Sequence, residues 1–171
     1  YKEIGMDHFA LPEDELFKAY EGGVLNRNFM GYTTTNTEMN IGLGVSSISD
    51  ITIAYGQNEK LIPDYYARLN NDEFPITKGI EVDARNAIIR DTIKQILCNG
   101  NSDISGEMQS LMSDNQWKTL KDIEADGLIQ LSDAHIQITE EGKPYIRTIC
   151  AVFDPTVDIN MSRKGLFSTS I

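Results

Sequence analysis

Residues 83 to 98 read DARNAIIRDTIKQILC and carry the clearest helical pattern in this chain. Asp83 stands where a helix begins, and its carboxylate can accept hydrogen bonds from the free N–H groups of the first turn. The apolar positions recur every three or four residues, as one face of a helix requires. They are Ile88, Ile89, Thr92, Ile93, Ile96 and Leu97. Arg85, Arg90 and Lys94 fall on the other side, so this stretch predicts an amphipathic helix that packs on a core.

The residues that follow predict the order helix, helix, strand, strand, helix. Strands are expected at 128–131 and 136–139, because apolar and polar residues alternate in the second of them. Helices are expected at 105–112, 116–125 and 140–153. Thr139 can cap the last of these helices. This order resembles a winged helix.

The residues before 83 are dominated by strand-like segments with short polar links, which favour antiparallel pairing. Strands are expected at 29–34, 41–49, 51–56 and 76–81. Short helices are expected between Pro12 and Gly22, and from Glu59 to Leu69 with Pro63 near the first turn. We therefore predict an α+β fold with two domains. Residues 1–82 form the first, and residues 83–171 form a helical, winged-helix-like second domain.

The composition is that of a soluble, acidic protein. The 171 residues include 26 Asp and Glu against 15 Lys and Arg, which gives a net charge of −11, and 40% of them are hydrophobic. A phosphate backbone requires the opposite charge, so nucleic acid is not an expected partner. No apolar run approaches the roughly 20 residues that a membrane helix needs, so no membrane association is expected. The expected location is the cytoplasm.

The two cysteines, Cys98 and Cys150, are far apart and both lie in apolar helical patterns. Two buried free thiols are therefore expected rather than a disulfide, as in a reducing compartment. Neither cysteine belongs to a Cys-x-x-Cys or similar group, so no metal or iron–sulfur site is expected from this sequence. His135 is expected in a surface turn.

Three parts of the sequence become specific when they are taken in order. IGMDHFA spans residues 4–10, RNFMGYTT spans 27–34, and GLGVSSIS at 42–49 is followed by AYGQN at 54–58. Together they resemble the oxygen-independent coproporphyrinogen III oxidases, a family of radical S-adenosylmethionine enzymes. A sister branch of haem chaperones carries His-Asn-Leu-x-Tyr-Trp where this chain has Arg-Asn-Phe-Met-Gly-Tyr. This difference favours the oxidase branch and leaves the chaperone branch as the alternative.

The resemblance implies that a few antiparallel strands of residues 1–82 extend a radical S-adenosylmethionine barrel that this chain lacks. In the family, three thiolates of the barrel hold a [4Fe–4S] cluster, which binds S-adenosylmethionine. A 5′-deoxyadenosyl radical takes a hydrogen from a propionate of coproporphyrinogen III, and loss of carbon dioxide and an electron leaves a vinyl group. Two such rounds give protoporphyrinogen IX in haem synthesis. The cluster thiolates are not in this sequence, so the chain alone is expected to bind no cluster or cofactor and to be inactive.

The first residues lead to a further expectation. The chain starts at Tyr1 and enters the first specific segment at once, so we expect a carboxy-terminal fragment whose partner is the missing barrel. By the resemblance, residues 1–10 form a parallel barrel strand with one neighbour removed. Its unpaired edge is apolar at Ile4, Met6 and Phe9. Dimerisation through this edge is expected, and folding back onto the chain's own strands is the alternative.

Ile48 is the first candidate site residue, because the matching position in the family contacts bound S-adenosylmethionine. A branched apolar side chain can pack against an adenine face. Gly42 and Gly44 would let a ligand or a neighbouring strand approach closely. From the residues alone, the simpler interpretation is that Ile48 belongs to a sheet core and that the glycines are bulge positions.

The other candidate site residues are polar. The resemblance puts Asp7 and His8 at the carboxyl end of the last barrel strand, where barrel enzymes hold their chemistry. His8 could hydrogen-bond a cofactor or move a proton, or it could simply cap a loop. Arg27 is the cation that we expect to face a propionate, because its planar guanidinium matches a carboxylate. A salt bridge from Arg27 to one of the many acidic side chains is the alternative.

Three functions therefore remain to be compared: a part of the oxidase, a haem-binding chaperone module, and a nucleic-acid-binding winged helix. Acidic residues outnumber basic ones between positions 116 and 147, which argues against the third function. Retention of haem would favour the second, and a salt-sensitive shift of DNA on a gel would favour the third.

Overall fold

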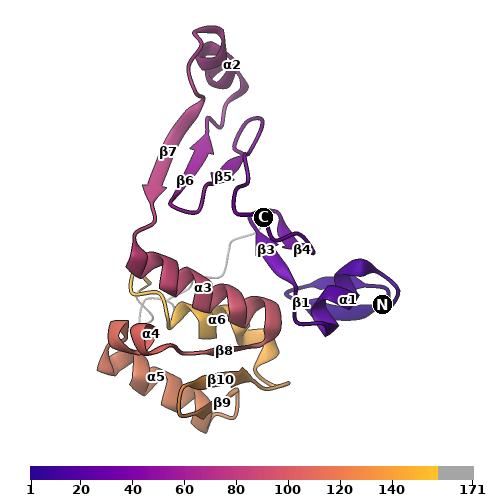
Figure 1. The fold of residues 1–171 in the computed structure, drawn as a ribbon, viewed down its shortest axis with the longest axis vertical. Coiled ribbons are helices and arrows are strands. Elements are labelled where there is room, and N and C mark those ends of the chain that lie inside the picture. The colour runs from indigo at the N-terminus through magenta and orange to yellow at the C-terminus, as the bar shows by residue number, and fades with distance from the viewer. Residues whose placement is uncertain (158–171) are drawn as a thin grey trace, which may run out of the picture.

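A computed structural model describes residues 1–157 as small antiparallel sheets and helices (Figure 1). The first part of the chain forms β1 (Lys2–Gly5), β2 (His8–Ala10), α1 (Glu15–Glu21), β3 (Asn26–Asn28), β4 (Gly31–Thr33), β5 (Ile48–Asp50), β6 (Ala54–Asn58), α2 (Ile62–Asn70) and β7 (Ile76–Glu81). The second part forms α3 (Ala84–Asn99), β8 (Asn101–Asp103), α4 (Gly106–Leu111), α5 (Asp114–Ala125), β9 (Ile129–Ser132), β10 (His135–Ile138), the 3-10 helix η1 (Lys143–Tyr145) and α6 (Ile146–Ala151). The predicted α+β class is confirmed.

The predicted amphipathic helix is α3. The Asp83 carboxylate accepts a hydrogen bond from the Asn86 N–H at 2.7 Å, and Gly100, with a φ of 70°, ends the helix. Ile89 and Ile96 of the predicted stripe are buried. The capping residue and the buried face of α3 are therefore both as the sequence predicts.

The elements α3, β8, α4, α5, β9 and β10 follow one another in the order of a winged helix. β8, β10 and β9 form one antiparallel sheet with β10 at its centre. The two helices and the β9–β10 hairpin agree with the prediction from the sequence. Strand β8 is not predicted, because Asn101, Ser102 and Asp103 are all polar and show no alternation.

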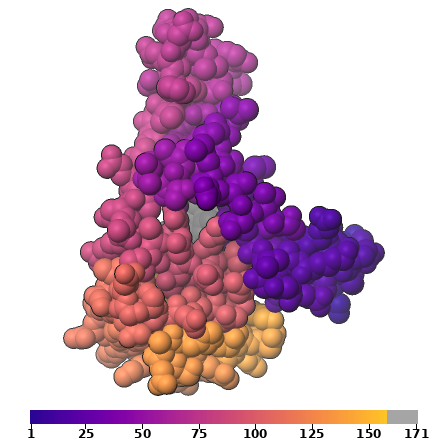
Figure 2. Space-filling model, in the orientation of Figure 1, coloured from indigo at the N-terminus to yellow at the C-terminus, as the bar shows by residue number. Residues whose placement is uncertain are grey.

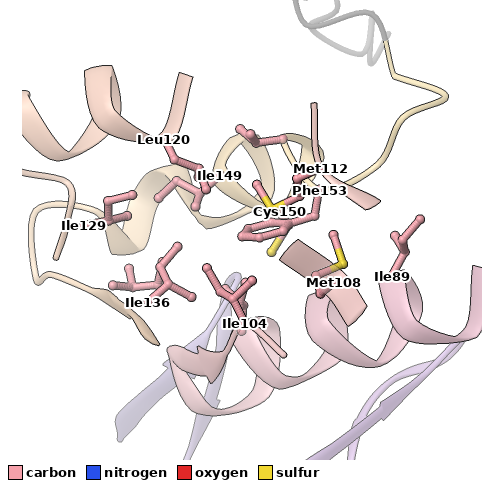
Figure 3. Packing of buried hydrophobic residues seen from close by; sticks show 13 residues of the cluster. Ile89, Ile104, Met108, Met112, Leu120, Ile129, Ile136, Ile149, Cys150 and Phe153 are labelled. Atoms are coloured by element: carbon pink, nitrogen blue, oxygen red, sulfur yellow. The ribbon is translucent and has the colours of Figure 1, made fainter. Parts of the chain in front are cut away.

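One continuous core joins these elements (Figure 3). Its buried members are Ile89, Ile96, Ile104, Met108, Met112, Leu120, Ile129, Ile136, Ile138, Ile149, Cys150, Val152 and Phe153. The buried Gln116 side chain donates from Nε2 to the Val152 carbonyl at 2.7 Å, so this polar group is satisfied inside the core. Cys98 and Cys150 are buried free thiols, as predicted. Burial raises the pKa of the Cys150 thiol to about 12.

The β5–β6–β7 sheet stands away from this core. It lies at the top of Figure 1 with α2 at its end, and in Figure 2 this part forms a narrow projection. β6 is the central strand and pairs antiparallel with both neighbours. Every residue of β7 is exposed, and α2 buries none of its residues. This region therefore has little core of its own.

The amino-terminal segment differs from its prediction. Residues 1–10 do not form one continuous strand; β1 and β2 form an antiparallel hairpin with Lys2 opposite Ala10. Met6 and Asp7 make the turn with φ values of 44° and 66°, which L residues rarely adopt, so the sequence gives no turn signal there. β1 thus already has a partner within the chain. Dimerisation through this segment stays a prediction.

Three other predicted boundaries are corrected. The strand expected at 41–49 is a loop that joins β5 only at Ile48, and the strand expected at 29–34 begins with a turn before β4. The last helix starts late, because the Gly142 N–H bonds to the Thr139 hydroxyl at 3.0 Å in a turn before η1. His135 begins β10, where its Nδ1 lies 2.8 Å from the Asp103 carboxylate.

Across residues 1–157, no helix combines the length and apolarity that crossing a bilayer requires.

Candidate functional site

A glycine loop, residues 41–47, leads into β5. Gly42 has no room for a side chain, because a Cβ there would lie 2.8 Å from the Ile48 carbonyl oxygen. Gly44 has a φ of 94°, which favours glycine. The close approach that the sequence predicts for these glycines is thus made by the chain itself, as the glycine loop folds back on the first residue of β5.

Two side chains from outside the glycine loop hold it in place. Asn58, at the end of β6, is only 4% exposed, and its Nδ2 donates to the Gly42 and Gly44 carbonyls at 3.1 and 2.9 Å. The Gly44 N–H donates to the Tyr65 hydroxyl of α2 at 3.2 Å. Neither Asn58 nor Tyr65 is predicted as a site residue from the sequence. Its one available signal is the position of Asn58, a polar residue closing the specific segment AYGQN.

Ile48 pairs with Gln57 across β5 and β6 and is half-buried. Successive residues of a strand point to opposite faces of a sheet, and paired residues share a face. Ile48 therefore shares its face with Asp50 and with Tyr55, which pairs with Asp50. Ser49 lies on the opposite face.

The face of Ser49 carries an apolar pocket of about 510 Å³, here named the glycine-floored pocket. Gly56 pairs with Gly79 to form its floor. Its walls include Ile41, Leu43, Tyr65, Leu69, Phe74 and Ile76. Ile48 does not line this pocket, so the two features lie on opposite faces of the sheet.

Arg27 and His8 come together around Tyr32. The guanidinium carbon of Arg27 lies 4.6 Å from the centroid of the Tyr32 ring, and the His8 ring meets Tyr32 edge-on at 5.0 Å. The Tyr32 hydroxyl donates to the Leu97 carbonyl of α3 at 2.9 Å. Burial raises the pKa of Tyr32 despite the opposing effect of Arg27, so this hydroxyl stays a donor at neutral pH. The strand pair β3–β4 is thereby anchored to the last turn of α3.

Asp7 does not join this cluster, because its side chain is exposed in the β1–β2 turn. His8 Nδ1 lies 2.9 Å from the Met6 carbonyl, which can only accept, so this nitrogen carries the proton. The other ring nitrogen faces Gly31, where a Cβ would lie 3.1 Å from it. The structure therefore brings together two of the three polar candidates, His8 and Arg27, and leaves Asp7 apart.

Arg27 also lines a second cavity of about 600 Å³, here named the polar cavity. It lies between the β3–β4 pair, the β5–β6 hairpin and α3. Its lining residues are Arg27, Asn28, Phe29, Asn36, Thr37, Glu38, Asp50, Thr52, Tyr55, Arg90, Asp91, Ile93, Lys94 and Leu97. Asp50 lines this cavity and shares its sheet face with Ile48, so the polar cavity lies on the side of the sheet that carries Ile48.

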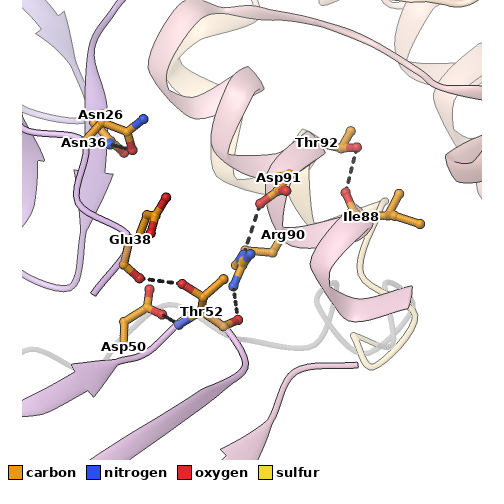
Figure 4. A network of polar contacts seen from close by, with 9 residues as sticks. All are labelled: Asn26, Asn36, Glu38, Asp50, Thr52, Ile88, Arg90, Asp91 and Thr92. Atoms are coloured by element: carbon orange, nitrogen blue, oxygen red, sulfur yellow. Dashed lines mark hydrogen bonds and ion pairs between the residues drawn. The ribbon is translucent and has the colours of Figure 1, made fainter. Parts of the chain in front are cut away.

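Arg90 of α3 lines the polar cavity, and Figure 4 shows its side chain reaching from α3 to Thr52. Its Nη1 donates to the Thr52 carbonyl at 2.9 Å, and its Nε pairs with Asp91 at 3.1 Å. Desolvation lowers the pKa of Arg90, but hydrogen bonds with Tyr55 and Asp91 outweigh it, and the pKa is raised. Arg90 thus ties the β5–β6 hairpin to α3.

Residues 1–157 contain no group of three His, Cys, Asp or Glu side chains that could hold a metal ion. What this part of the chain offers a ligand is apolar surface beside the glycine loop, aromatic rings, and the cations of the polar cavity.

No protein-family model matches the chain. Curated proteins named oxygen-independent coproporphyrinogen III oxidase do match it. The Pseudomonas aeruginosa protein is 42% identical over 161 residues, covering 90% of this chain and 35% of that protein. The Escherichia coli K12 protein is 39% identical over 160 residues, with the same coverage. The Synechocystis protein is 35% identical over 182 residues, covering 100% of this chain and 39% of that protein.

A solved structure matches the fold as well. It is a coproporphyrinogen III oxidase from Escherichia coli, described as a radical S-adenosylmethionine enzyme. The TM-score is 0.83 at 40% identity, and the match covers 92% of this chain and 38% of that one. The chain thus spans 35–39% of the length of the curated relatives compared above, and it matches their carboxy-terminal part.

Proposed function

Because this chain is homologous to the carboxy-terminal part of the oxygen-independent coproporphyrinogen III oxidases, we propose that it serves in such an enzyme. The reaction is the oxidative decarboxylation of two propionates of coproporphyrinogen III to vinyl groups. The carrying observation is the match of sequence and fold. The Synechocystis relative matches over 100% of this chain, so its match includes the glycine loop and Ile48.

S-adenosylmethionine and a [4Fe–4S] cluster are the cofactors of this proposal. They supply the radical that takes a hydrogen from a propionate. The resemblance implies three cluster thiolates and this sequence has two cysteines, so we place the cluster in the part of the enzyme outside the match. A contact with S-adenosylmethionine suits Ile48, whose side chain is half-buried at the start of β5. Gly42 and Gly44 act indirectly, by letting the glycine loop fix the position of Ile48.

The exposed apolar side chains support docking against a large partner. Leu43, Phe74 and Met30 are 83%, 86% and 92% exposed, and such surface is costly to leave in water. Most of each relative's length lies outside the match. We propose that this remaining part, with the cofactor-binding barrel, covers residues 1–82. The chain alone would then be inactive.

A chimera tests the proposal. The carboxy-terminal part of the Escherichia coli enzyme is replaced by this chain, and anaerobic conversion of coproporphyrinogen III to protoporphyrinogen IX is measured. Activity of the chimera is expected. In the same chimera, Ile48→Asp should weaken S-adenosylmethionine binding, while Ile48→Val should not. The melting temperature is measured in parallel, because a charge at a half-buried position also lowers stability. Unchanged cofactor affinity in a folded Ile48→Asp chimera would show that Ile48 has no such role.

Two other functions are weaker. The relatives compared above are named oxidases, which disfavours the haem-chaperone branch, and purified chain that retains haem would reverse this judgement. For nucleic-acid binding, α5 stands where a winged helix has its recognition helix. It carries Asp114, Asp122 and Glu124 against Lys118 and Lys121, an unfavourable charge for phosphate contacts.

A further inference from the structure

We propose that Arg27 and Lys94 form a carboxylate-binding site in the polar cavity, and that this site holds a propionate of the substrate that is not being decarboxylated. The inference rests on the proposed function for the identity of its ligand. The anion site itself rests on the geometry of β3 and α3.

Arg27 is partly buried and has one buried donor atom without a partner among the described residues. Its Nη1 is inaccessible to water and has no hydrogen-bond acceptor among the described residues. Leaving a buried charged donor unpaired costs more than leaving a neutral one, so such an atom indicates a missing acceptor. The guanidinium is held by the Tyr32 ring at 4.6 Å, and Tyr32 is itself anchored to Leu97. Arg27 is therefore fixed before any ligand arrives.

Lys94 supplies the second positive charge. It lies on α3, lines the polar cavity together with Arg27, and is partly buried. Within residues 1–157 neither Arg27 nor Lys94 makes an ion pair. Two unpaired cations on one cavity are unusual in a chain whose net charge is −11. They make this cavity a local exception to the acidic surface.

The other charges of the polar cavity are largely engaged. Arg90 and Asp91 pair with each other at 3.1 Å. The Asp50 carboxylate accepts the Thr52 N–H at 2.9 Å. Glu38 is the remaining acid, and it is exposed, so water screens it. The lining holds three acids and three bases, and among its bases Arg27 and Lys94 are the two that form no ion pair within residues 1–157.

The rest of the cavity fits a pyrrole ring that carries a propionate. Phe29 and Tyr55 meet edge-to-face at 5.2 Å, and Ile93 and Leu97 line α3. A volume of about 600 Å³ lies within the range of small-molecule sites. Coproporphyrinogen carries a propionate on each of its pyrrole rings. The guanidinium of Arg27 would bind one of these carboxylates by a charge-assisted hydrogen bond while another reacts elsewhere.

The first experiment uses propionate itself on the whole chain, at constant ionic strength. NMR signals of the Arg27 Nε–Hε group and of the Lys94 amide should shift on titration with propionate and not with propionamide. Arg27→Gln and Lys94→Gln should each abolish or strongly weaken the response. Arg85→Gln is the matched control, because Arg85 is an exposed cation outside the polar cavity on the same helix. No response in the unsubstituted chain overturns the anion site. A response in Arg27→Gln and Lys94→Gln as large as that of the unsubstituted chain also overturns it. Lys94→Gln keeps the test valid if Arg27→Gln loses its packing on Tyr32.

The second experiment uses coproporphyrin III and its tetramethyl ester as probes. Loss of one charge-assisted contact should weaken coproporphyrin binding about tenfold or more in Arg27→Gln, with no change for the ester. If coproporphyrin binds and its affinity is the same in the parent chain, Arg27→Gln and Lys94→Gln, the function stands and the anion site is wrong. A propionate response without coproporphyrin binding means that the anion site stands and that its assignment to a substrate propionate is wrong.

Discussion

The two parts of the chain differ in how far their apolar side chains are buried. Between Ile89 and Phe153 they gather into one buried core. Between Tyr1 and Ile80 most large apolar side chains are exposed to solvent. Among the described residues, every large exposed apolar side chain except Tyr145 lies in this range. The amino-terminal part has a small buried cluster, which consists of Ile4, Ala10, Ala19, Leu25 and Cys98. Cys98 belongs to α3, so one member of this cluster comes from the other part of the chain.

This difference indicates how each part is stabilised. A buried apolar side chain contributes roughly 1.5–3 kcal/mol, so the α3–α6 region holds itself together. The β5–β6–β7 sheet is held instead by hydrogen bonds, by Arg90 and by the Asn58 network. Its exposed surface is therefore available for docking, and its local stability is expected to be lower.

The largest effect should follow from damage to the core. Phe153→Ala removes a fully buried ring and should lower the free energy of unfolding by about 3–5 kcal/mol. Phe74→Ala, at a side chain that is 86% exposed, should change it by less than about 0.5 kcal/mol. Urea unfolding followed by the fluorescence of Trp117 in α5 measures both. Similar losses for the two variants would mean that the two parts do not differ.

Alkaline pH should weaken the core region through Cys150. Burial raises the folded pKa of this thiol to about 12, above its unfolded value. The stabilising contribution is thus complete below the unfolded pKa and is lost as pH rises toward the folded one. By pH 11 the loss should be about 2–3 kcal/mol. The contribution of Cys150 is measured by comparing the urea midpoints of the parent chain and of Cys150→Ala at pH 8 and pH 11. Equal pH dependence in both proteins would contradict the prediction.

Removal of the Asn58 side chain should lower the stability of the amino-terminal part locally, at the glycine loop and β5. Asn58→Ala breaks two hydrogen bonds to the glycine loop and leaves two partly buried carbonyls without this donor, at a cost of about 1–3 kcal/mol. Amide hydrogen exchange should therefore accelerate in the glycine loop and β5, while α3 stays protected. Asn70→Ala, on the exposed end of α2, is the control. Accelerated exchange in both parts would show that they unfold as one unit.

The smallest effect on stability should come from the exposed sheet. Ile80→Ser, at a side chain that is 63% exposed, should change the free energy of unfolding by less than about 0.5 kcal/mol. It should nevertheless reduce self-association of the chain, measured by sedimentation at high concentration, because it interrupts an exposed apolar surface. If self-association is unchanged, this part of the surface does not engage other molecules.

The sequence predicted the core region better than the sheet region. Periodicity and the Asp83 cap identify α3, and alternation identifies the β9–β10 hairpin, because burial imposes those patterns. The β1–β2 turn and the glycine loop depend on positive φ angles and on contacts with distant residues such as Asn58. Local patterns do not record such contacts. The candidate roles of Ile48 and Arg27 come from the resemblance and stay predictions. Asn58, Tyr65 and Lys94 are recognised only from their surroundings in the structure.

The tight packing around Gly42 limits which inherited substitutions the protein can tolerate. Any missense change in its codon adds a Cβ, and every such atom would meet the Ile48 carbonyl oxygen at 2.8 Å, a backbone group that cannot rotate aside. Gly106 differs, because a Cβ there meets nothing within 4 Å. A population of variants should therefore tolerate alleles at codon 106 and purge them at codon 42. Of these two glycines, only Gly42 is expected to be invariant among descendant sequences.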